Sequence, residues 1–417
     1  MKVFTADMQN QYARAIKCNF MDHYTVEFFL DEGSFGSVYL ARHIKTQNVV
    51  AVKAICREQL KKTSVLTDLR NEITTLLDVQ HPNLIHLEAV FDDENEEHVF
   101  LVMEYANGGD LYTQIVKKDI DYTEHEARTI FLQTARAVHY LHTKNIVHRD
   151  LKPENIVLSS MENDAGIKII DFGFATTLAD DQVMTEICGT LGYIAPEILK
   201  GLSYNNRCDV WSLGIILYIL LSGVQPFFHD DEAEEKRRVF EGDLHFPDES
   251  FADCPDAVDL LRNMLRVDPK DRFNMQQVLD HNWCAMRTVR PLEHVVSGLN
   301  SILAQKRWKK AFNCTKLIAR IKICAQVRLL DSTSSYASTA SECEDASDGP
   351  FHFRRYGKES FTSRSSTRCS STASSDSTAS HSDHIRVHSK SLESEWKMAD
   401  ESTDDSVDPL EKMRIVC

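Results

Sequence analysis

The sequence predicts an α+β protein of two lobes, a small lobe rich in β-strands followed by a larger helical lobe. From residue 24 to about Gly109, apolar and polar residues mostly alternate, which is the period of half-buried strands. Beyond Gly109 the apolar residues recur at helical spacing. The chain of 417 residues is long enough for two such lobes and further segments.

The chain is expected to have four parts. Residues 1–23 form a short leader, and residues 24–283 form the two-lobed domain. Residues 284–330 form a regulatory-type segment. Residues 331–417 are rich in Ser, Thr, Asp and Glu and contain few large apolar residues, so we expect a disordered tail.

The composition argues against several classes of protein. A net charge of −16 disfavours nucleic acid as a partner. The eleven cysteines contain no C-x-x-C pair, so free thiols in a reducing compartment are expected. The longest apolar stretch, residues 215–221, is too short to span a bilayer. We therefore expect a monomeric cytoplasmic protein that could also enter the nucleus, without stable membrane insertion.

The most informative stretch is the string HRDLKPEN at residues 148–155. A hydrophobic strand and then the triplet DFG at residues 171–173 follow it. Phosphoryl transfer needs a carboxylate near the acceptor hydroxyl and oxygen ligands for magnesium. Asp150 can supply the first, and Asn155 and Asp171 can supply the second.

Other motifs follow the order found in eukaryotic protein kinases. LDEGSFGSV at residues 30–38 is similar to the glycine-rich loop, and AVK at residues 51–53 resembles the motif of the β3 lysine. APE at residues 195–197 resembles the end of the activation segment. The chain thus resembles this family over residues 24–283. The resemblance implies the bilobal protein kinase fold and transfer of phosphate to proteins.

The resemblance implies a role for each matched polar residue. Lys53 would contact the α and β phosphates of ATP and pair with Glu72. Asp150 would accept the proton of the substrate hydroxyl. Lys152 and Thr190, which would lie beside Asp150, resemble the residues of serine/threonine kinases and not those of tyrosine kinases.

The expected cofactors are ATP and Mg²⁺. The implied magnesium ligands are Asn155 and Asp171. The residues implied for the ATP site are, in chain order, Leu30, Gly33, Ser34, Phe35, Gly36, Val38, Ala51, Lys53, Met103, Glu104, Ala106, Asp110, Val157 and Asp171.

Two positions depart from the family pattern. Asp31 stands where the family usually has the first glycine of the loop. A carboxylate there should repel a triphosphate, so we expect weaker ATP binding without loss of activity. Leu191 replaces a common proline near the place of the substrate residue that follows the acceptor, and a modest effect is expected.

The activation segment carries Glu186 two residues before Cys188. Related calmodulin-dependent kinases that need an upstream kinase have a threonine at this position, whereas the catalytic subunit of phosphorylase kinase has a glutamate. We hypothesise that Glu186 pairs with Arg149 and holds the segment active without phosphate. The alternative is that Glu186 is a solvated side chain and Thr185 is the phosphorylation site.

Two acids match positions that read arginine in the substrates of basophilic kinases. Asp110 and Glu154 therefore favour substrates of the form Arg-x-x-Ser/Thr. Each acid also has a simpler interpretation, as a contact to the ATP ribose for Asp110 and as surface charge for Glu154.

Residues 299–330 contain no Asp or Glu and are rich in Lys and Arg. Apolar residues are interleaved with these charges, as in a basic amphipathic helix that binds calmodulin or a membrane surface. The stretch KRWKKAFN at residues 306–313 resembles the calmodulin-binding region of type I calcium/calmodulin-dependent protein kinases. Trp308, Phe312 and Ile321 are the expected anchors for calcium-loaded calmodulin.

The sequence therefore predicts a serine/threonine kinase with an internal gate. Residues 287–320 would lie across the substrate groove until calmodulin removes them. Three alternatives remain open at this point. One is a calmodulin-binding scaffold that binds ATP weakly because of Asp31. The second is a constitutive kinase whose basic helix binds membranes, and the third is a basic helix packed permanently on the large lobe.

Overall fold

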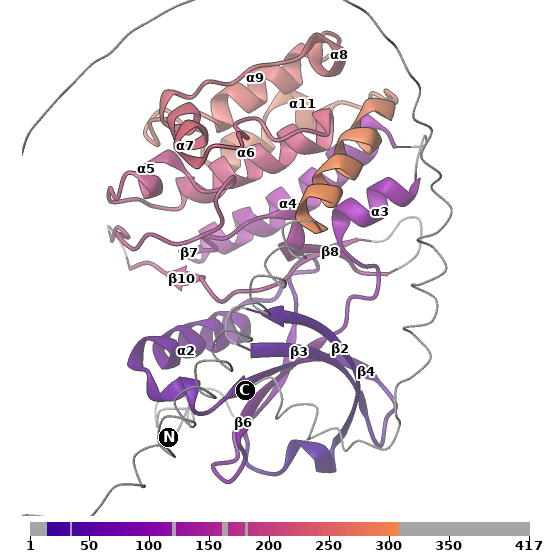
Figure 1. Cartoon of the computed structure of the whole chain (residues 1–417), viewed down its shortest axis with the longest axis vertical. Helices are drawn as coiled ribbons and strands as arrows, with labels where there is room; N and C mark the ends of the chain where they lie inside the picture. The colour runs from indigo at the N-terminus through magenta and orange to yellow at the C-terminus, as the bar shows by residue number, and fades with distance from the viewer. Residues whose placement is uncertain (1–14, 34–35, 119–121, 161–165, 180–181, 308–417) are drawn as a thin grey trace, which may run out of the picture. The chain divides into compact units, whose positions relative to one another are not determined.

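The computed structural model describes residues 15–33, 36–118, 122–160, 166–179 and 182–307. Within them, a mixed sheet in the order β1-β5-β6-β4-β3-β2 forms the small lobe (Figure 1). Neighbouring strands are antiparallel except β1 and β5. The strands are β1 (Ala15–Ile16), β2 (Tyr24–Gly33), β3 (Gly36–His43), β4 (Val49–Cys56), β5 (Leu87–Phe91) and β6 (His98–Glu104).

The small lobe begins inside the predicted leader. The short strand β1 pairs with β5, and the 3-10 helix η1 (Phe20–Asp22) places the ring of Phe20 in the core of the sheet. Phe20 stacks on Phe100 with ring centroids 4.4 Å apart. From Ala15 onward, the segment therefore packs with the lobe that follows it.

One long helix packs on this sheet. The 3-10 helix η2 (Gln59–Lys61) leads into α2 (Thr63–Asp78), whose buried residues Leu66, Leu69, Ile73 and Leu76 recur at helical spacing. Such spacing puts them on one face, which is the face that contacts the core. Glu72 is buried on the same helix, 2% exposed, and this position directs it toward the sheet.

The large lobe is helical and is built around α6 (Arg207–Ser222). Every residue of α6 from Cys208 to Ser222 is buried, because neighbouring helices surround it. The elements around it are α3 (Leu111–Lys118), α4 (Glu124–Thr143), α5 (Pro196–Leu199), α7 (Glu232–Glu241), α8 (Asp248–Phe251), α9 (Pro255–Met264), α10 (Met275–Leu279) and α11 (Asn282–Ala285).

Short strands carry the loops at the edge of the large lobe that faces the small lobe (Figure 1). β7 (Ile146–Val147) pairs with β10 (Thr176–Thr177), and β8 (Ile156–Leu158) pairs with β9 (Ile167–Ile169). The segment between β7 and β8 includes the 3-10 helix η4 (Pro153–Asn155). The HRDLKPEN string therefore lies between two antiparallel pairs that hold both of its ends.

A further helix, residues 293–307, packs on the large lobe and is drawn in orange in Figure 1. Its apolar residues Val295, Val296, Leu299 and Ile302 are buried, as is Leu292 just before it. Their spacing gives the helix one apolar face. The part of the predicted regulatory segment that the structure describes is thus docked.

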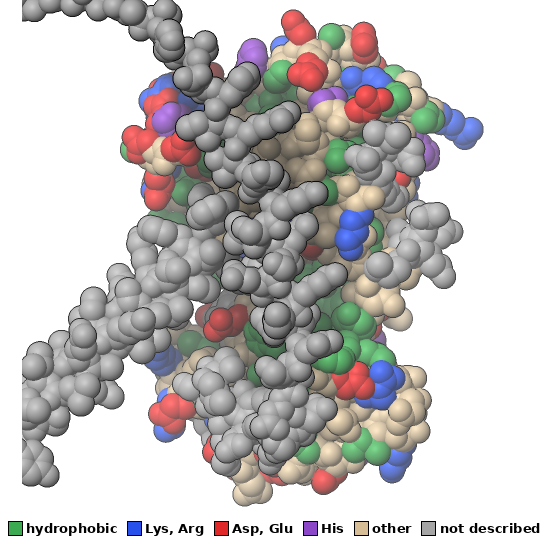
Figure 2. All heavy atoms as spheres, turned by 45° about the vertical axis from the view of Figure 1, so that its right-hand side comes forward, with side chains coloured by type: hydrophobic (Ala, Val, Ile, Leu, Met, Phe, Trp, Pro, Cys, Tyr) green, Lys and Arg blue, Asp and Glu red, His purple; other side chains and the backbone are tan. Residues whose placement is uncertain are grey.

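Acidic side chains gather at the end of the large lobe formed by α8 and α9, at the top of Figure 2. Asp248, Glu249, Asp253 and Asp259 are exposed there. Part of the net negative charge is therefore displayed on this surface. Within the described residues, no helix is both long and apolar enough to cross a membrane.

A buried ion pair joins two distant parts of the large lobe. Arg272 donates to both carboxylate oxygens of Glu197, over 2.7 and 2.8 Å, and the two residues are 1% and 4% exposed. Three backbone carbonyls also accept hydrogen bonds from Arg272. All three nitrogen atoms of the guanidinium therefore donate hydrogen bonds within the protein.

We predict that Arg272→Ala lowers the free energy of unfolding by about 3–5 kcal/mol, because it leaves the carboxylate of Glu197 buried without its partner. Chemical denaturation followed by fluorescence measures the change. Arg266→Ala is the control, since the Arg266 side chain is exposed and should contribute little. Coinciding unfolding curves of the two variants would contradict the prediction.

Candidate active site

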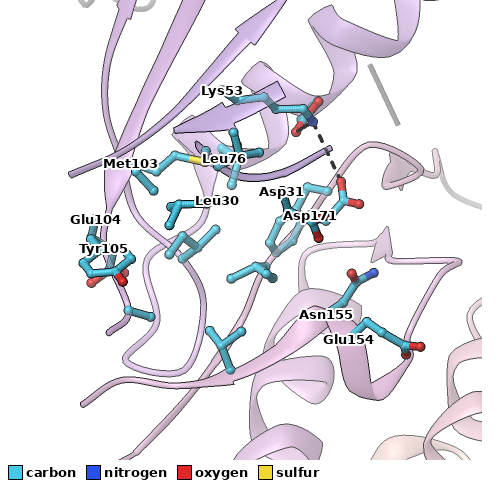
Figure 3. A pocket seen from close by; sticks show the side chains of 18 of the residues that line it. Leu30, Asp31, Lys53, Leu76, Met103, Glu104, Tyr105, Glu154, Asn155 and Asp171 are labelled. Carbon is cyan, nitrogen blue, oxygen red and sulfur yellow. Dashed lines mark hydrogen bonds and ion pairs between the residues drawn. The ribbon is translucent and has the colours of Figure 1, made fainter. Parts of the chain in front are cut away.

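A cavity of about 470 Å³ lies between the sheet of the small lobe and the loops of the large lobe (Figure 3). Val38 on β3 and Ala51 on β4 line it from the small lobe, and Val157 on β8 lines it from the large lobe. Leu30 and Met103 also belong to its apolar part. A flat apolar ring such as adenine fits between two such surfaces.

At the inner end of the cavity lies a charged group of three residues. Lys53 Nζ contacts Glu72 Oε1 over 2.6 Å and Asp171 Oδ1 over 3.8 Å. Burial opposes the charge on Lys53, but the two carboxylates outweigh burial and raise its pKa. The ammonium is therefore held charged, in a position where it can bind a phosphate oxygen.

The catalytic loop has a strained backbone that one carboxylate supports. Arg149 has φ +67°, in the left-handed region that non-glycine residues seldom adopt. Asp209 at the start of α6 accepts hydrogen bonds from the backbone N–H of His148, over 3.0 Å, and of Arg149, over 2.9 Å. His142 Nε2 lies 2.9 Å from the same carboxylate. Asp209 thus fixes the loop just before Asp150.

Asp150 lies at the centre of a hydrogen-bonded group. Thr190 Oγ1 donates to Asp150 Oδ1 over 2.7 Å, and Lys152 Nζ donates to Asp150 Oδ2 over 2.6 Å. Lys152 also donates to Thr190 Oγ1 over 2.9 Å. Asn155 Nδ2 donates to the backbone oxygen of Asp150 over 2.9 Å. A carboxylate held in this way can orient a hydroxyl and accept its proton.

Asp171 and Asn155 fit the ligand chemistry of magnesium. Asp171 lines the cavity and adopts φ +63°, and its Oδ1 accepts the N–H of Gly173 over 3.2 Å. Since the nitrogen of the Asn155 amide bonds to the loop, its Oδ1 is available to a cation. Magnesium usually takes one or two protein oxygens and completes its shell with phosphate and water.

The structure brings most of the predicted ATP-site residues to this cavity and leaves some outside its lining. Asp110 is exposed, and its Oδ1 accepts the N–H of Thr113 at the start of α3 over 3.0 Å. Gly33 and Gly36 pair at the end of the β2–β3 hairpin. Ser34 and Phe35 lie outside the described residues. The nucleotide role of these residues stays a prediction.

Gly36 has a steric role of its own. A Cβ atom there would lie 2.1 Å from the backbone oxygen of Ala54 on β4. Only glycine allows β3 to approach β4 this closely. The last glycine of the loop motif, Gly36, is therefore required by the sheet itself.

Sequence reasoning did not assign every residue of the lining. Tyr105, Ile85 and Ile170 line the cavity. Tyr105 lies between Glu104 and Ala106, which were both predicted for the ATP site, and this was the available signal. Ile85 and Ile170 belong to apolar runs, which predict burial in the core but do not indicate a binding site.

Asp31 lines the mouth of the cavity together with Glu32. The strand is extended at this point, so the aspartate fits without a positive φ, and a register shift lies between Phe29 and Asp31. Asp31 Oδ1 accepts the N–H of Glu32 over 2.9 Å. Two carboxylates therefore lie at the entrance that a triphosphate would use.

The fold and this site define a phosphate-transferring enzyme with two lobes, and a comparison with protein-family models agrees. The model of the protein kinase domain matches residues 24–284. The class of protein is therefore a protein kinase, and such kinases use ATP and Mg²⁺.

Comparison with individual proteins shows which protein kinases this chain is similar to. The chain is 35% identical over 314 residues to calcium/calmodulin-dependent protein kinase type 1 of Macrobrachium nipponense, covering 74% of this chain and 89% of the relative. It is 36% identical over 308 residues to the human type 1B kinase, covering 73% and 88%. Myosin light chain kinase A of Dictyostelium discoideum is 38% identical over 275 residues, covering 64% and 92%.

The chain therefore belongs to the protein kinase family and, within it, to the serine/threonine kinases related to calcium/calmodulin-dependent protein kinase type 1.

We predict that Asp31→Gly lowers the KM for ATP roughly threefold, because it removes one negative charge at the entrance of the triphosphate. Initial-rate kinetics at fixed peptide concentration measure the change. Asp31→Asn separates charge from backbone freedom, since it keeps the side-chain size and removes only the charge. An unchanged KM in both variants would contradict the repulsion.

Proposed function

We propose that this protein is a calmodulin-gated serine/threonine kinase whose own helix, residues 293–307, closes the substrate groove at rest. Calcium-loaded calmodulin would bind the basic stretch that follows and draw the helix away. The names of the two type 1 relatives support calmodulin as the activator. The docked position of the helix supports inhibition by the chain itself.

The observation that carries this proposal is the contact between Lys306 and Glu154. Lys306 Nζ lies 2.5 Å from Glu154 Oε1 and 5.2 Å from the centroid of the Tyr112 ring. A carboxylate beside an aromatic face is a favourable site for a cation. Glu154 is also the acid expected to read arginine in the substrate. We therefore propose that Lys306 takes the place of a substrate arginine in the resting state.

The residues of the cavity have distinct proposed roles. Lys53, held by Glu72, binds the phosphates of ATP, and Asp171 with Asn155 binds Mg²⁺, which neutralises the charge of the transferring phosphate when bound. Asp150 orients the substrate hydroxyl and accepts its proton. Lys152 moves from Asp150 toward the transferred group as the substrate arrives.

The preferred substrate is proposed to be a protein segment of the form Arg-x-x-Ser/Thr. Glu154, freed from Lys306, would accept the guanidinium of the arginine, because a planar guanidinium suits a carboxylate. Thr190 and Lys152 close the space around Asp150, which suits the short hydroxyl side chains of serine and threonine.

Contacts of the activation segment support the proposal that the kinase is active without a phosphate there. Arg149 Nη1 donates to Glu186 Oε2 over 3.0 Å, and Arg149 Nε donates to the backbone oxygen of Phe174 over 2.6 Å. Tyr204 Oη donates to the backbone oxygen of Glu186 over 2.7 Å. These bonds tie the segment to the catalytic loop, as a phosphorylated threonine would.

A second acid lies near this pair. Asp68 on α2 has a raised pKa, first because of partial burial and then because of the charge of Glu186. A phosphate in place of the Glu186 carboxylate would add more negative charge beside Asp68.

The proposed calmodulin anchors Trp308, Phe312 and Ile321 lie outside the described residues and stay predictions. Calmodulin is acidic and rich in methionine, so it suits a basic helix with large apolar residues. The competing interpretation, binding to a membrane, predicts sedimentation with anionic vesicles. We further propose a cytoplasmic monomer.

The test is phosphate transfer from ATP to an Arg-x-x-Ser peptide by unphosphorylated full-length protein, with and without calcium-calmodulin. We expect at least tenfold stimulation. Equal and high activity in both conditions would keep the kinase and discard the gate. Absence of activity in both, together with weak ATP binding, would favour the calmodulin-binding scaffold.

We predict that Glu186→Ala lowers the calmodulin-stimulated activity about threefold, because an exposed ion pair contributes only modestly to holding the segment. The same peptide assay measures the loss. Glu249→Ala, which removes an exposed acid on α8, is the control. Unchanged activity in Glu186→Ala would remove the pairing as the reason for phosphate independence.

A further inference from the structure

The start of the docked segment is tied firmly to α4. The carboxylate of Glu124, 3% exposed, accepts hydrogen bonds from Trp283 Nε1 over 2.9 Å and from Arg290 Nε over 3.2 Å. Arg128 Nη2 donates to it over 2.6 Å and to Thr288 Oγ1 over 2.8 Å. Glu124, Arg128 and Trp283 are buried, and the partly buried Arg290 and the exposed Thr288 are hydrogen-bonded to them. Residues 288–290 are therefore an anchored root for the helix that follows.

Backbone hydrogen bonds extend this root. The N–H of Glu124 donates to the oxygen of Arg290 over 2.7 Å, and the N–H of Leu292 donates to the oxygen of Tyr122 over 2.9 Å. His294 Nε2 lies 3.1 Å from the backbone oxygen of Leu221, one of the last carbonyls of α6. The first turn of the helix is thus bonded to α4 and to the end of α6.

Two glycines then bring two backbones into contact. Gly223 ends α6 with φ +74°, and Gly298 lies in the middle of the docked helix. A Cβ atom on Gly298 would lie 2.4 Å from the backbone oxygen of Gly223 and 2.9 Å from its Cα atom. Both neighbours are backbone atoms, so no side chain can rotate away to make room.

Gly298 does not stabilise the helix to which it belongs. Glycine inside a helix is less favourable than alanine by about 1 kcal/mol. The close approach to Gly223 is what the missing side chain allows, and it lets Val295 and Leu299 on either side of Gly298 be fully buried. The pair of glycines therefore sets how close to the large lobe the helix lies.

The separation of Gly298 from Gly223 also determines the position of Lys306 at the far end of the helix. At 1.5 Å per residue, Gly298 lies about 9 Å from Leu292 and Lys306 lies about 21 Å from it. A methyl group on Gly298 needs about 1 Å of additional separation to reach ordinary contact distance. With the root fixed, this displacement grows to about 2 Å at Lys306, which takes its ammonium beyond ion-pair distance of Glu154.

We propose that the Gly223–Gly298 contact is the control point of the gate, because it lets the helix lie close enough to the large lobe for Lys306 to reach Glu154. This inference rests on the proposed function and adds the feature of the helix that sets resting activity. A larger residue at position 298 opens the substrate groove without calmodulin, while the root stays bound.

Gly298→Ala in the full-length protein tests this inference. Its peptide-phosphorylating activity without calmodulin is expected to rise at least threefold, and its activity with saturating calcium-calmodulin is expected to equal that of the wild type. Ser301→Ala is the matched control, since Ser301 is exposed on the same helix and its hydroxyl bonds only within the helix. Because alanine strengthens a helix, intrinsic propensity alone predicts no rise in activity.

The outcomes separate the inference from the proposed function. A wild type that calmodulin does not stimulate would overturn the gate itself. A stimulated wild type with unchanged resting activity in Gly298→Ala would overturn only the glycine control point.

Hydrogen exchange gives a second measurement on the same proteins and keeps the test decisive if Gly298→Ala loses activity. Faster exchange of the amides of residues 299–307 with unchanged protection at residues 288–292 is the expected result. Equal protection of residues 299–307 in variant and wild type would overturn the inference.

Discussion

The catalytic geometry depends on the carboxylate of Asp209. It accepts two consecutive backbone N–H groups of the catalytic loop and holds Arg149 at φ +67°, a conformation that costs an L-residue roughly 1–2 kcal/mol. Burial alone would raise the pKa of Asp209, but hydrogen bonding and charge from His142, with a contribution from His148, lower it. The carboxylate therefore stays ionised in the core. Without it, Asp150 would lose its fixed place and Arg149 its reach to Glu186.

Helix α6 connects this constraint to the gate. Its first turn carries Asp209 and supports the catalytic loop, and its end at Gly223 meets the docked helix at Gly298. Since α6 is buried along its length, both ends are fixed relative to each other. Helix α6 therefore supports both the catalytic loop at one end and the docked helix at the other. In the proposed gate, a small displacement at one end of the docked helix decides whether a substrate reaches Asp150.

The sequence predicted the two-lobed fold from the spacing of apolar residues. It predicted Lys53, Glu72, Asp150 and Asp171 because each of these residues belongs to a short motif of recognisable chemistry. It did not predict the hydrogen bonds of Glu124 with Arg290, since these residues are 166 positions apart and no periodicity specifies such a partner. Gly298 likewise has no local signal, because its role exists only against the backbone of Gly223. The role of Asp110 as a cap of α3 competes with its predicted role at the ribose, and both use the same carboxylate.

The central claim of the proposal is that the docked helix blocks the substrate subsite at Glu154, a residue at the border of the ATP cavity, and leaves the nucleotide part of the cavity open. Among the described residues, those that line the cavity include none from the docked helix. The most direct measurement is the KM for an Arg-x-x-Ser peptide and the KM for ATP, each with and without calcium-calmodulin. The account predicts that calmodulin lowers the peptide KM at least fivefold and leaves the ATP KM within about twofold, since only the arginine subsite is occupied at rest. A change confined to the ATP KM would contradict it.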